Sequence, residues 1–295
     1  MRLPRKYLLK GQALILVLLG MAVVLTLVLS IVSTSITDID VSTRDEEATR
    51  ALNAAEAGVE QSFLIADDSS GTIGEYSQYS AVVTGIAEGS TIYNSPKVVD
   101  AGDTVALWYV SHNGNDLVCD PLNGFPCMAA DTSLKICFGN DPKPENAPAI
   151  EVSVYYDTSG LGVLNGNFTN VAVARAVFDS VESRSLANNF ALADAGECKL
   201  ESVSYLYSAA IDNVANYFNL ACTDCILNVK VKPVYNSLPL PVGFESGAIL
   251  PTQGVKIVST GTSGGSSRRL EVFRSFKNNP AIFDNAVFSF NSLVK

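Results

Sequence analysis

An uncharged apolar run near the start of the chain constrains the fold more than any other feature. Residues 13–32 read ALILVLLGMAVVLTLVLSIV, twenty residues without a charged side chain. At about 1.5 Å per residue, a helix of this length spans the roughly 30 Å hydrocarbon core of a membrane. A buried core helix is disfavoured, because such a helix rarely continues this far without a polar face. The run therefore predicts a membrane-spanning helix.

The charges on either side of the run predict its orientation. Four basic side chains precede it, and the first charges after it are acidic, at Asp38 and Asp40. Because basic residues stay on the cytoplasmic side, we expect the N-terminus in the cytoplasm and the rest of the chain outside. A cleaved secretory signal is the main alternative, but its apolar region has about 7 to 15 residues and ends in an A-x-A-like site. The longer run favours an anchor.

The sequence after the run predicts that the same helix continues beyond the membrane. Residues 37–65 contain no proline and are rich in Ala, Glu and Leu. We therefore expect one helix of about fifty residues, roughly 75 Å long. Glu46 precedes Arg50 by four residues, which is the favourable order for an ion pair on a helix surface.

One face of this second half carries small and apolar residues at steps of three and four. The stripe comprises Ala48, Ala51, Leu52, Ala55, Val59, Ser62 and Phe63. Together with Gly58, it is small enough for a sheet to approach the helix closely. A dimeric coiled coil is the alternative, and it is disfavoured because such coils use larger residues at their core positions.

The remainder of the chain has the pattern of a β-rich domain. Short runs of Val, Ile, Tyr and Phe are separated by clusters of Gly, Asn, Asp and Pro. The expected strands are 104–111, 134–138, 149–156, 171–178, 226–234, 255–260 and 270–276. The last two form an expected hairpin around a Gly/Ser loop at 261–267, and a short helix is expected over 207–218. The predicted fold class is α+β, with the long N-terminal helix packed on a mainly antiparallel domain of one or two subdomains.

Composition and charge narrow the function classes. Hydrophobic residues make up 47% of the chain and charged residues 17%, so the body should fold. The net charge is −10, and beyond the four leading basic residues 16 basic residues face 30 acidic ones. Such an acidic body repels phosphate backbones, so we expect no nucleic-acid partner.

Six cysteines lie in the body and none in the apolar run. They are Cys119, Cys127, Cys137, Cys198, Cys222 and Cys225. An even number in an exported domain favours disulfides, which persist in oxidising compartments. Six cysteines allow fifteen pairings, and the sequence does not choose among them.

The sequence offers little for catalysis. Cys222 and Cys225 form a C-x-x-C motif, but a redox site wants the first thiol at the start of a helix, and the residues that follow read as a strand. A structural disulfide, within the motif or to Cys137 or Cys198, is favoured. Zinc would need two more ligands, and His112 is the only histidine, which also argues against a hydrolytic triad. We expect no catalytic residue, metal site or cofactor.

Two stretches resemble a known protein family. Residues 10–15 read KGQALI between a short basic leader and the apolar run, which resembles a class III-type prepilin signal that prepilin peptidase cuts after the glycine. Residues 50–60 read RALNAAEAGVE and resemble the R-A-x-x-A-A-E-A-G-hydrophobic-E stretch of PilX-type pilus assembly proteins. The resemblance covers about the first 65 residues.

The resemblance implies roles for several positions. Gly11 is the last residue of a leader spanning 1–11, and Gln12 is the mature N-terminus and a candidate for N-methylation. The helix of residues 12–65 holds the subunit in the inner membrane and then packs against other pilin subunits, while residues 66–295 form the extracytoplasmic domain at the cell surface. Expected helix packing and assembly positions are Leu16, Ala51, Ala55, Gly58 and Val59.

One position departs from the family pattern. Major pilins usually carry a glutamate at the fifth mature position, where its carboxylate pairs with the terminal amine of a neighbour. Here that position is Leu16. A buried carboxylate without a partner is costly, and leucine removes both the cost and the pairing. The resemblance therefore implies a minor or tip-associated subunit of a type IV pilus or pseudopilus, and not an enzyme.

Two alternatives stay open. The first is a single-pass surface protein or adhesin that keeps its anchor and never polymerises. Cleavage at Gly11 distinguishes the two, because only the filament subunit requires it. The second alternative is a membrane-tethered thiol oxidoreductase that uses Cys222 and Cys225.

Overall fold

The computed structural model describes residues 12–114, 116–160, 162–166, 169–220, 222 and 225–278. Gly11 and the rest of the predicted leader lie outside the described residues. The chain divides into two compact units. Unit 1 comprises Met1–Val83 and Ile257–Val272, and unit 2 comprises Thr84–Lys256 and Phe273–Lys295.

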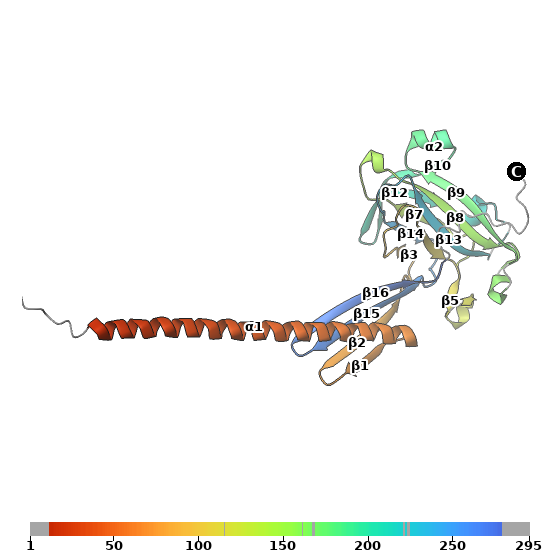
Figure 1. The fold of residues 1–295 in the computed structure, drawn as a ribbon. Coiled ribbons are helices and arrows are strands. Elements are labelled where there is room, and N and C mark those ends of the chain that lie inside the picture. The colour runs from red at the N-terminus through yellow and green to blue at the C-terminus, as the bar shows by residue number, and fades with distance from the viewer. Residues whose placement is uncertain are drawn as a thin grey trace, which may run out of the picture. The chain divides into compact units, whose positions relative to one another are not determined.

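Unit 1 is built around one long helix, α1 (Gln12–Ile65), which has 54 residues and appears as one continuous rod in Figure 1. The prediction of a single helix through residue 65 is confirmed. From residue 14 to residue 46 every side chain is exposed, including all of the large apolar ones. By length and composition this part of α1 can cross a membrane.

Hydroxyl side chains in the apolar half bond to the helix itself. Thr26 Oγ1 donates to the Val23 carbonyl at 2.8 Å, and Thr34 Oγ1 donates to the Ile31 carbonyl at 2.9 Å. A hydroxyl bonded in this way needs no water, so these threonines are compatible with an apolar environment. The helix ends where Ala66 takes a left-handed conformation with φ of 55°.

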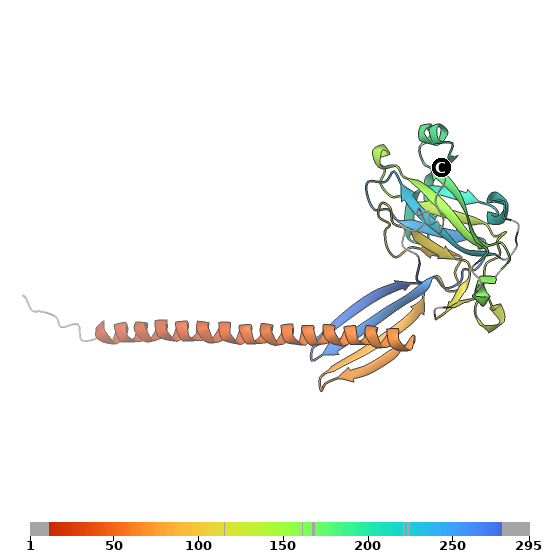
Figure 2. The same ribbon diagram turned by 45° about the vertical axis from the view of Figure 1, so that its right-hand side comes forward.

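The second half of α1 packs on a four-stranded sheet with the order β1-β2-β15-β16. The strands are β1 (Ser69–Ile73), β2 (Ser77–Gly85), β15 (Gly254–Ser263) and β16 (Ser266–Ser275). Figure 2 shows the helix lying across one face of these strands. The first two strands follow the helix directly, whereas the last two come from the far end of the described chain. Val59, Ala81 and Ile257 form the buried core of this unit.

Unit 2 is a sandwich of two five-stranded sheets. One has the order β10-β9-β8-β13-β4, and the other has the order β11-β12-β7-β14-β3. In the first sheet the strands are β10 (Ala191–Leu192), β9 (Val171–Asp179), β8 (Ala149–Asp157), β13 (Ile226–Val234) and β4 (Val105–Trp108). In the second they are β11 (Asp194–Leu200), β12 (Val203–Ile211), β7 (Leu134–Phe138), β14 (Val242–Ser246) and β3 (Ile92–Asn94).

The two sheets share one hydrophobic core. Val152 and Val229 from the first sheet belong to the same buried cluster as Ile136 and Phe244 from the second. Within the described residues β10 runs parallel to β9, and the other pairings in both sheets are antiparallel. The fold class is therefore α+β with mainly antiparallel sheets, as predicted.

Short elements complete unit 2. They are the hairpin β5 (Ser111–Asn113) and β6 (Asp116–Val118), the helices α2 (Glu182–Asn188) and α3 (Val214–Tyr217), and the 3-10 turns η1 (Pro121–Asn123), η2 (Pro144–Asn146) and η3 (Gly162–Asn165).

Most of the expected strands coincide with observed ones, and three expectations need correction. The helix predicted over 207–218 is wrong in its first half, because residues 207–211 belong to β12 and pair with β7, and only Val214–Tyr217 is helical. The strand predicted over 104–111 is interrupted after Trp108, and Ser111 begins the separate hairpin strand β5. The hairpin loop predicted over 261–267 is shorter, since β15 continues to Ser263 and only Gly264 and Gly265 turn.

Candidate functional site

The surface of α1 is the feature of unit 1 with the clearest chemical character, and it has two parts. The first part exposes apolar side chains on all sides, and Leu16 lies in it with 67% of its surface accessible. The second part buries a narrow face of small residues against the sheet, where Ala51 and Ala55 have 0% exposure and Val59 has 7%. Leu16 and the other four predicted assembly positions are thus separated by roughly 50 Å of helix.

Gly58 allows the sheet to come close to the helix. A Cβ atom at this position would overlap the Ser259 Oγ and would lie 2.8 Å from Cδ2 of the Tyr79 ring. The same ring lies over Gly71, its cross-strand partner in β1, where a Cβ would be 2.9 Å from the ring. Tyr79 therefore occupies the space that two missing side chains leave.

A second glycine provides the matching approach from the sheet. A Cβ at Gly261 of β15 would overlap the Ala51 carbonyl oxygen and would lie 2.5 Å from the Ala55 nitrogen. Glycine inside a strand commonly marks such close contact with another backbone. The sequence predicted a Gly/Ser loop over 261–267, and the packing role of Gly261 was missed. Gly261 directly follows the apolar run of 255–260, which was the available signal.

Polar contacts fix the same interface. Gly265 donates its backbone N–H to Glu47 Oε2 at 3.0 Å, which ties the β15–β16 turn to the helix. Ser62 and Ser69 share a hydroxyl–hydroxyl hydrogen bond of 2.8 Å between the helix and β1. The expected ion pair between Glu46 and Arg50 is present on the outer face of α1.

Gln12, the predicted mature N-terminus, begins α1. The apolar run starts directly after it, so the backbone from this residue onward is helical. Gly11, the predicted cleavage position, is outside the described residues.

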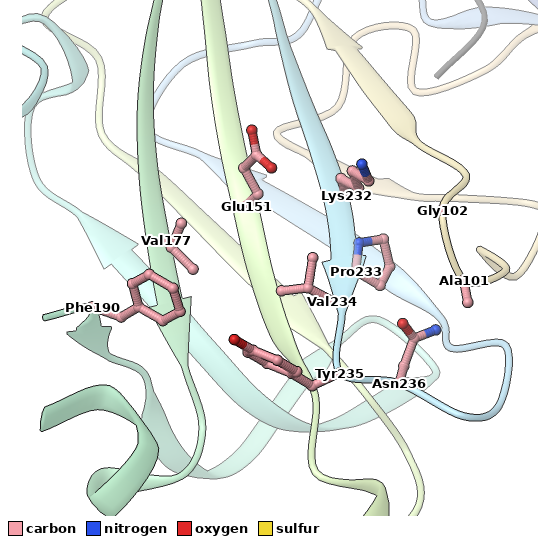
Figure 3. Close-up of a pocket in the computed structure, with 10 residues that line it drawn as sticks. All are labelled: Ala101, Gly102, Glu151, Val177, Phe190, Lys232, Pro233, Val234, Tyr235 and Asn236. Atoms are coloured by element: carbon pink, nitrogen blue, oxygen red, sulfur yellow. The ribbon is translucent and has the colours of Figure 1, made fainter. Parts of the chain in front are cut away.

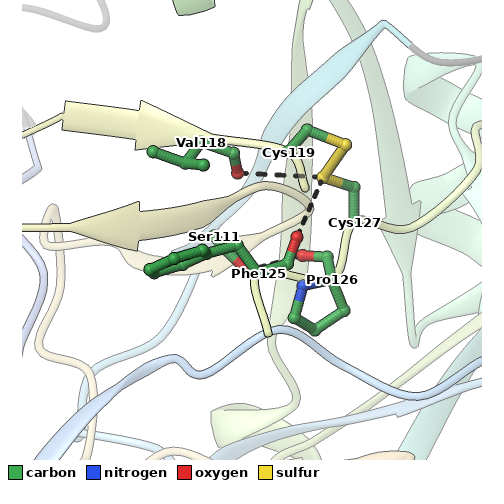
Figure 4. The surroundings of a disulfide bond; sticks show 6 residues. All are labelled: Ser111, Val118, Cys119, Phe125, Pro126 and Cys127. Atoms are coloured by element: carbon green, nitrogen blue, oxygen red, sulfur yellow. Dashed lines mark hydrogen bonds between the residues drawn. A yellow bond between two sulfur atoms is a disulfide. The ribbon is translucent and has the colours of Figure 1, made fainter. Parts of the chain in front are cut away.

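The six cysteines form three disulfides: Cys119–Cys127, Cys137–Cys198 and Cys222–Cys225. The first closes a loop of unit 2, shown in Figure 4. Inside this loop Asp120 and Phe125 exchange backbone hydrogen bonds of 2.9 and 3.0 Å, and Ser111 Oγ donates to the Pro126 carbonyl at 2.6 Å.

The other two disulfides lie in the body of the sandwich. Cys137 in β7 and Cys198 in β11 are buried beside Leu200 and Tyr205. Cys222 and Cys225 pair within the C-x-x-C motif, which is one of the pairings that the sequence left open. The motif precedes β13, and Cys225 has 0% exposure. A thiol oxidoreductase uses an accessible thiol at a helix start. Here Cys225 is buried directly before a strand, and Cys222 is partly exposed.

His112 lies between two aromatic rings. Its ring centroid is 4.4 Å from that of Trp108, edge to face, and 3.9 Å from that of Phe276, stacked. Its Nδ1 atom is buried and has no hydrogen-bond partner. Burial lowers the pKa of His112 to about 4. Within the described residues no three His, Cys, Asp or Glu side chains gather closely enough to hold a metal ion.

No family model matches the sequence, and no curated protein matches it.

Proposed function

We propose that this chain is a pilin-type structural subunit. Helix α1 first anchors it in the cytoplasmic membrane with its N-terminus inside, and later builds it into a type IV pilus or related pseudopilus as a minor, tip-type component. Prepilin peptidase removes residues 1–11, and other pilin subunits are its partners. The subunit acts by packing and not by catalysis.

The observation that carries this proposal is the division of α1 into two halves. Its apolar half has no protein neighbour among the described residues, so the roughly twenty residues of apolar helix need lipid or other helices around them. A helix that served only as an anchor would not need to continue beyond the membrane and pack on a sheet. In this chain one helix contains both the membrane segment and the part that packs on the sheet, so a shift of the membrane segment moves the sheet of unit 1 with it.

The close packing of the second half supports the same proposal. Gly58 and Gly261 bring the helix and sheet backbones together, and Glu47 holds the β15–β16 turn. Unit 1 therefore behaves as one body that can be shifted along its helix axis during assembly. The three disulfides stabilise unit 2, and disulfides persist in the oxidising environment expected outside the cytoplasm.

The lack of a carboxylate at Leu16 supports a minor role. In an apolar filament core a glutamate at this position would pair with the amine of a neighbouring Gln12, and leucine makes no such pair. The subunit then contributes apolar contacts only, which suits a position where one neighbour along the filament is missing.

The test is the mass and N-terminal sequence of the chain produced with and without prepilin peptidase. We expect a mature chain beginning at Gln12 only when the peptidase is present, and Gly11→Val should abolish this cleavage. Gly20→Val is the matched control, since nothing lies within 4 Å of a Cβ at that position, and it should leave cleavage intact. A chain that retains residues 1–11 under both conditions would contradict the proposal.

A single-pass surface domain that never polymerises is the second candidate, favoured by the same absence of a carboxylate at Leu16. The two differ in the sheared filament fraction of cells that carry the system. A subunit of the filament is recovered there with the other pilins, whereas an anchored surface domain stays entirely with the membranes.

A further inference from the structure

Unit 2 contains a cavity of about 400 Å³ that no part of the proposed assembly uses. It lies at the ends of β8, β9 and β13, beside the segment that follows α2. This volume is in the range of small-molecule sites, which is about 300–1,000 Å³. Figure 3 shows the rings of Phe190 and Tyr235 on one side of Val234, and Lys232 and Asn236 on the other.

The aromatic side of the cavity is held in place before any ligand arrives. The Arg184 guanidinium carbon lies 4.5 Å from the centroid of the Tyr235 ring. Arg184 is itself fixed, because its Nε and one terminal nitrogen each donate to the Asp179 carboxylate at 2.7 Å, and that carboxylate is fully buried. The terminal nitrogen also donates to the Ala147 carbonyl at 2.8 Å.

The backbone at Tyr235 is held in an uncommon conformation, with φ of 60°. A bulky side chain rarely adopts this region, so the surrounding structure must hold it there. The residue as a whole is 53% exposed. Tyr235 is therefore a fixed aromatic side chain that lines the cavity and has Arg184 over its ring.

The polar side offers a cation and hydrogen-bonding groups. Across the described part of the chain, no hydrogen bond or ion pair involves the Lys232 ammonium. Glu151 receives contacts from Arg175 at 3.5 Å and from Ser153 at 3.4 Å, both on Oε1, which leaves Oε2 to accept from a ligand. The side-chain N–H of Asn236 donates to the Leu238 carbonyl, which leaves its carbonyl oxygen available.

Two charged side chains line the cavity, Lys232 and Glu151, and their charges are opposite. Glu151 is also paired with Arg175, and Asp179 is paired with Arg184. The Lys232 ammonium, whose contacts are described above, is therefore the lining group that favours an anionic group on a ligand.

We propose that this cavity binds a carboxylated pyranose, such as a uronic acid residue at the end of a glycan. One face of a pyranose ring presents C–H groups, which pack on the rings of Tyr235 and Phe190. Its hydroxyls donate to Glu151 and to the Asn236 carbonyl oxygen, and its carboxylate pairs with Lys232. The cavity opens to solvent, so the rest of a glycan has room to extend outward.

The test is isothermal titration calorimetry on the full chain in a zwitterionic detergent without a sugar headgroup, because maltoside or glucoside detergents would compete. The probes are methyl β-D-glucuronide, methyl β-D-glucoside and benzoate. We expect saturable binding of the glucuronide that weakens with added salt, weaker binding of the glucoside, and none of benzoate. Loss of one charge-assisted hydrogen bond corresponds to about tenfold in affinity or more.

Two variants locate the site. Lys232→Met keeps the apolar stem and should weaken glucuronide binding about tenfold while leaving the glucoside unchanged. Tyr235→Leu should weaken both sugars. The controls are Lys199→Met in β11 and Tyr76→Leu in unit 1, which are exposed and do not line the cavity, and they should change neither.

Three results would overturn the proposal. They are no saturable binding of either sugar to the unsubstituted chain, equal binding of benzoate, and glucuronide binding that neither Lys232→Met nor Tyr235→Leu affects. Lys232→Met replaces a partly exposed side chain of similar length, so it tests the site even if Tyr235→Leu disturbs the fold. None of these outcomes depends on whether the chain enters a filament.

Discussion

At the scale of single residues, the contact between helix and sheet in unit 1 depends on the absence of a side chain at two glycines. Gly58 and Gly261 face the opposite backbone or ring at distances that a methyl group would violate. Such positions tolerate no enlargement, because the neighbour on each side is part of a regular element and has little freedom to move.

Gly58→Ala should lower the free energy of unfolding by about 1–3 kcal/mol, since its Cβ overlaps the Ser259 hydroxyl and approaches the Tyr79 ring. Alanine favours helix more than glycine does, which offsets up to about 1 kcal/mol of this loss. Chemical denaturation in detergent, followed by circular dichroism, measures the change. Gly20→Ala in the same helix is the control, and it should be neutral or stabilising. An equal response of the two variants would show that the contact at Gly58 is not tight.

His112 should titrate far below an ordinary histidine. Burial between Trp108 and Phe276 disfavours the imidazolium form and lowers the pKa to about 4. The folded pKa is thus below the unfolded value of about 6.5, so this group's contribution to stability is complete above that pH and is lost as pH falls toward 4.

The measurement is the imidazole C2–H proton signal in a titration by nuclear magnetic resonance. The chain has one histidine, so one signal reports it without assignment. A midpoint near pH 6.5 in the folded protein would contradict the stacked and partly buried position of the ring. Phe276→Ala should move the midpoint upward, because it opens one side of the ring to water.

At the scale of elements, the sequence correctly predicted the helix and the strands whose residues form uninterrupted apolar runs. The continuous helix followed from twenty uncharged residues and an alanine-rich continuation. The strands at 134–138 and 226–234 are buried on both faces or nearly so, and their apolar runs identified them. For these two strands burial decides the structure, so the apolar runs in the sequence carry the signal.

The sequence did not predict the elements whose stability comes from pairing with strands elsewhere in the chain. Strands β1 and β11 read SSGTI and DAGECKL and were not predicted, because pairing with β2 and β12 forms them and their own apolar content does not. Residues 207–211 were assigned to a helix, yet their backbone pairs with β7. The site residues Ser259 and Gly261 were missed because they contact α1 from a strand distant in sequence, and Tyr79 was missed because its strand forms by pairing with β1.

The disulfides should contribute unequally to stability. Cys137 and Cys198 are 61 residues apart, whereas Cys119 and Cys127 are 8 apart. Closing the longer loop removes more entropy from the unfolded chain, so chain-entropy arguments give about 4 kcal/mol for the first pair and about 2.5 kcal/mol for the second. Replacing both cysteines of each pair by alanine and comparing denaturation midpoints tests the order. A larger loss from the short loop would show that native contacts, and not loop length, dominate.

At the scale of the whole molecule, the proposed assembly uses the surface of α1 that lies outside both cores. Leu16→Glu places a carboxylate in the apolar half, where it is costly unless it pairs with the terminal amine of a neighbouring Gln12. If the absence of this pair confines the chain to a minor role, the variant should be recovered severalfold more abundantly in sheared filaments. Quantitative immunoblotting of the filament fraction measures it, with Leu18→Glu as the control at an equally apolar position. Unchanged recovery of Leu16→Glu in the filament fraction would show that residue 16 does not determine the minor role.

The strand order of unit 1 has a further consequence for how the chain is made. β2 and β15 belong to one sheet although about 170 residues separate them, so all of the sandwich in unit 2 is an insertion between two neighbouring strands. In the proposed orientation α1 stays in the membrane and the chain behind it is exported, so β1 and β2 emerge first and must wait with an open sheet edge until β15 and β16 follow. The inserted sandwich has a continuous core of its own and can form during that interval. The unit that carries the helix is therefore the first to begin and the last to be completed, and the length of the insertion sets the delay.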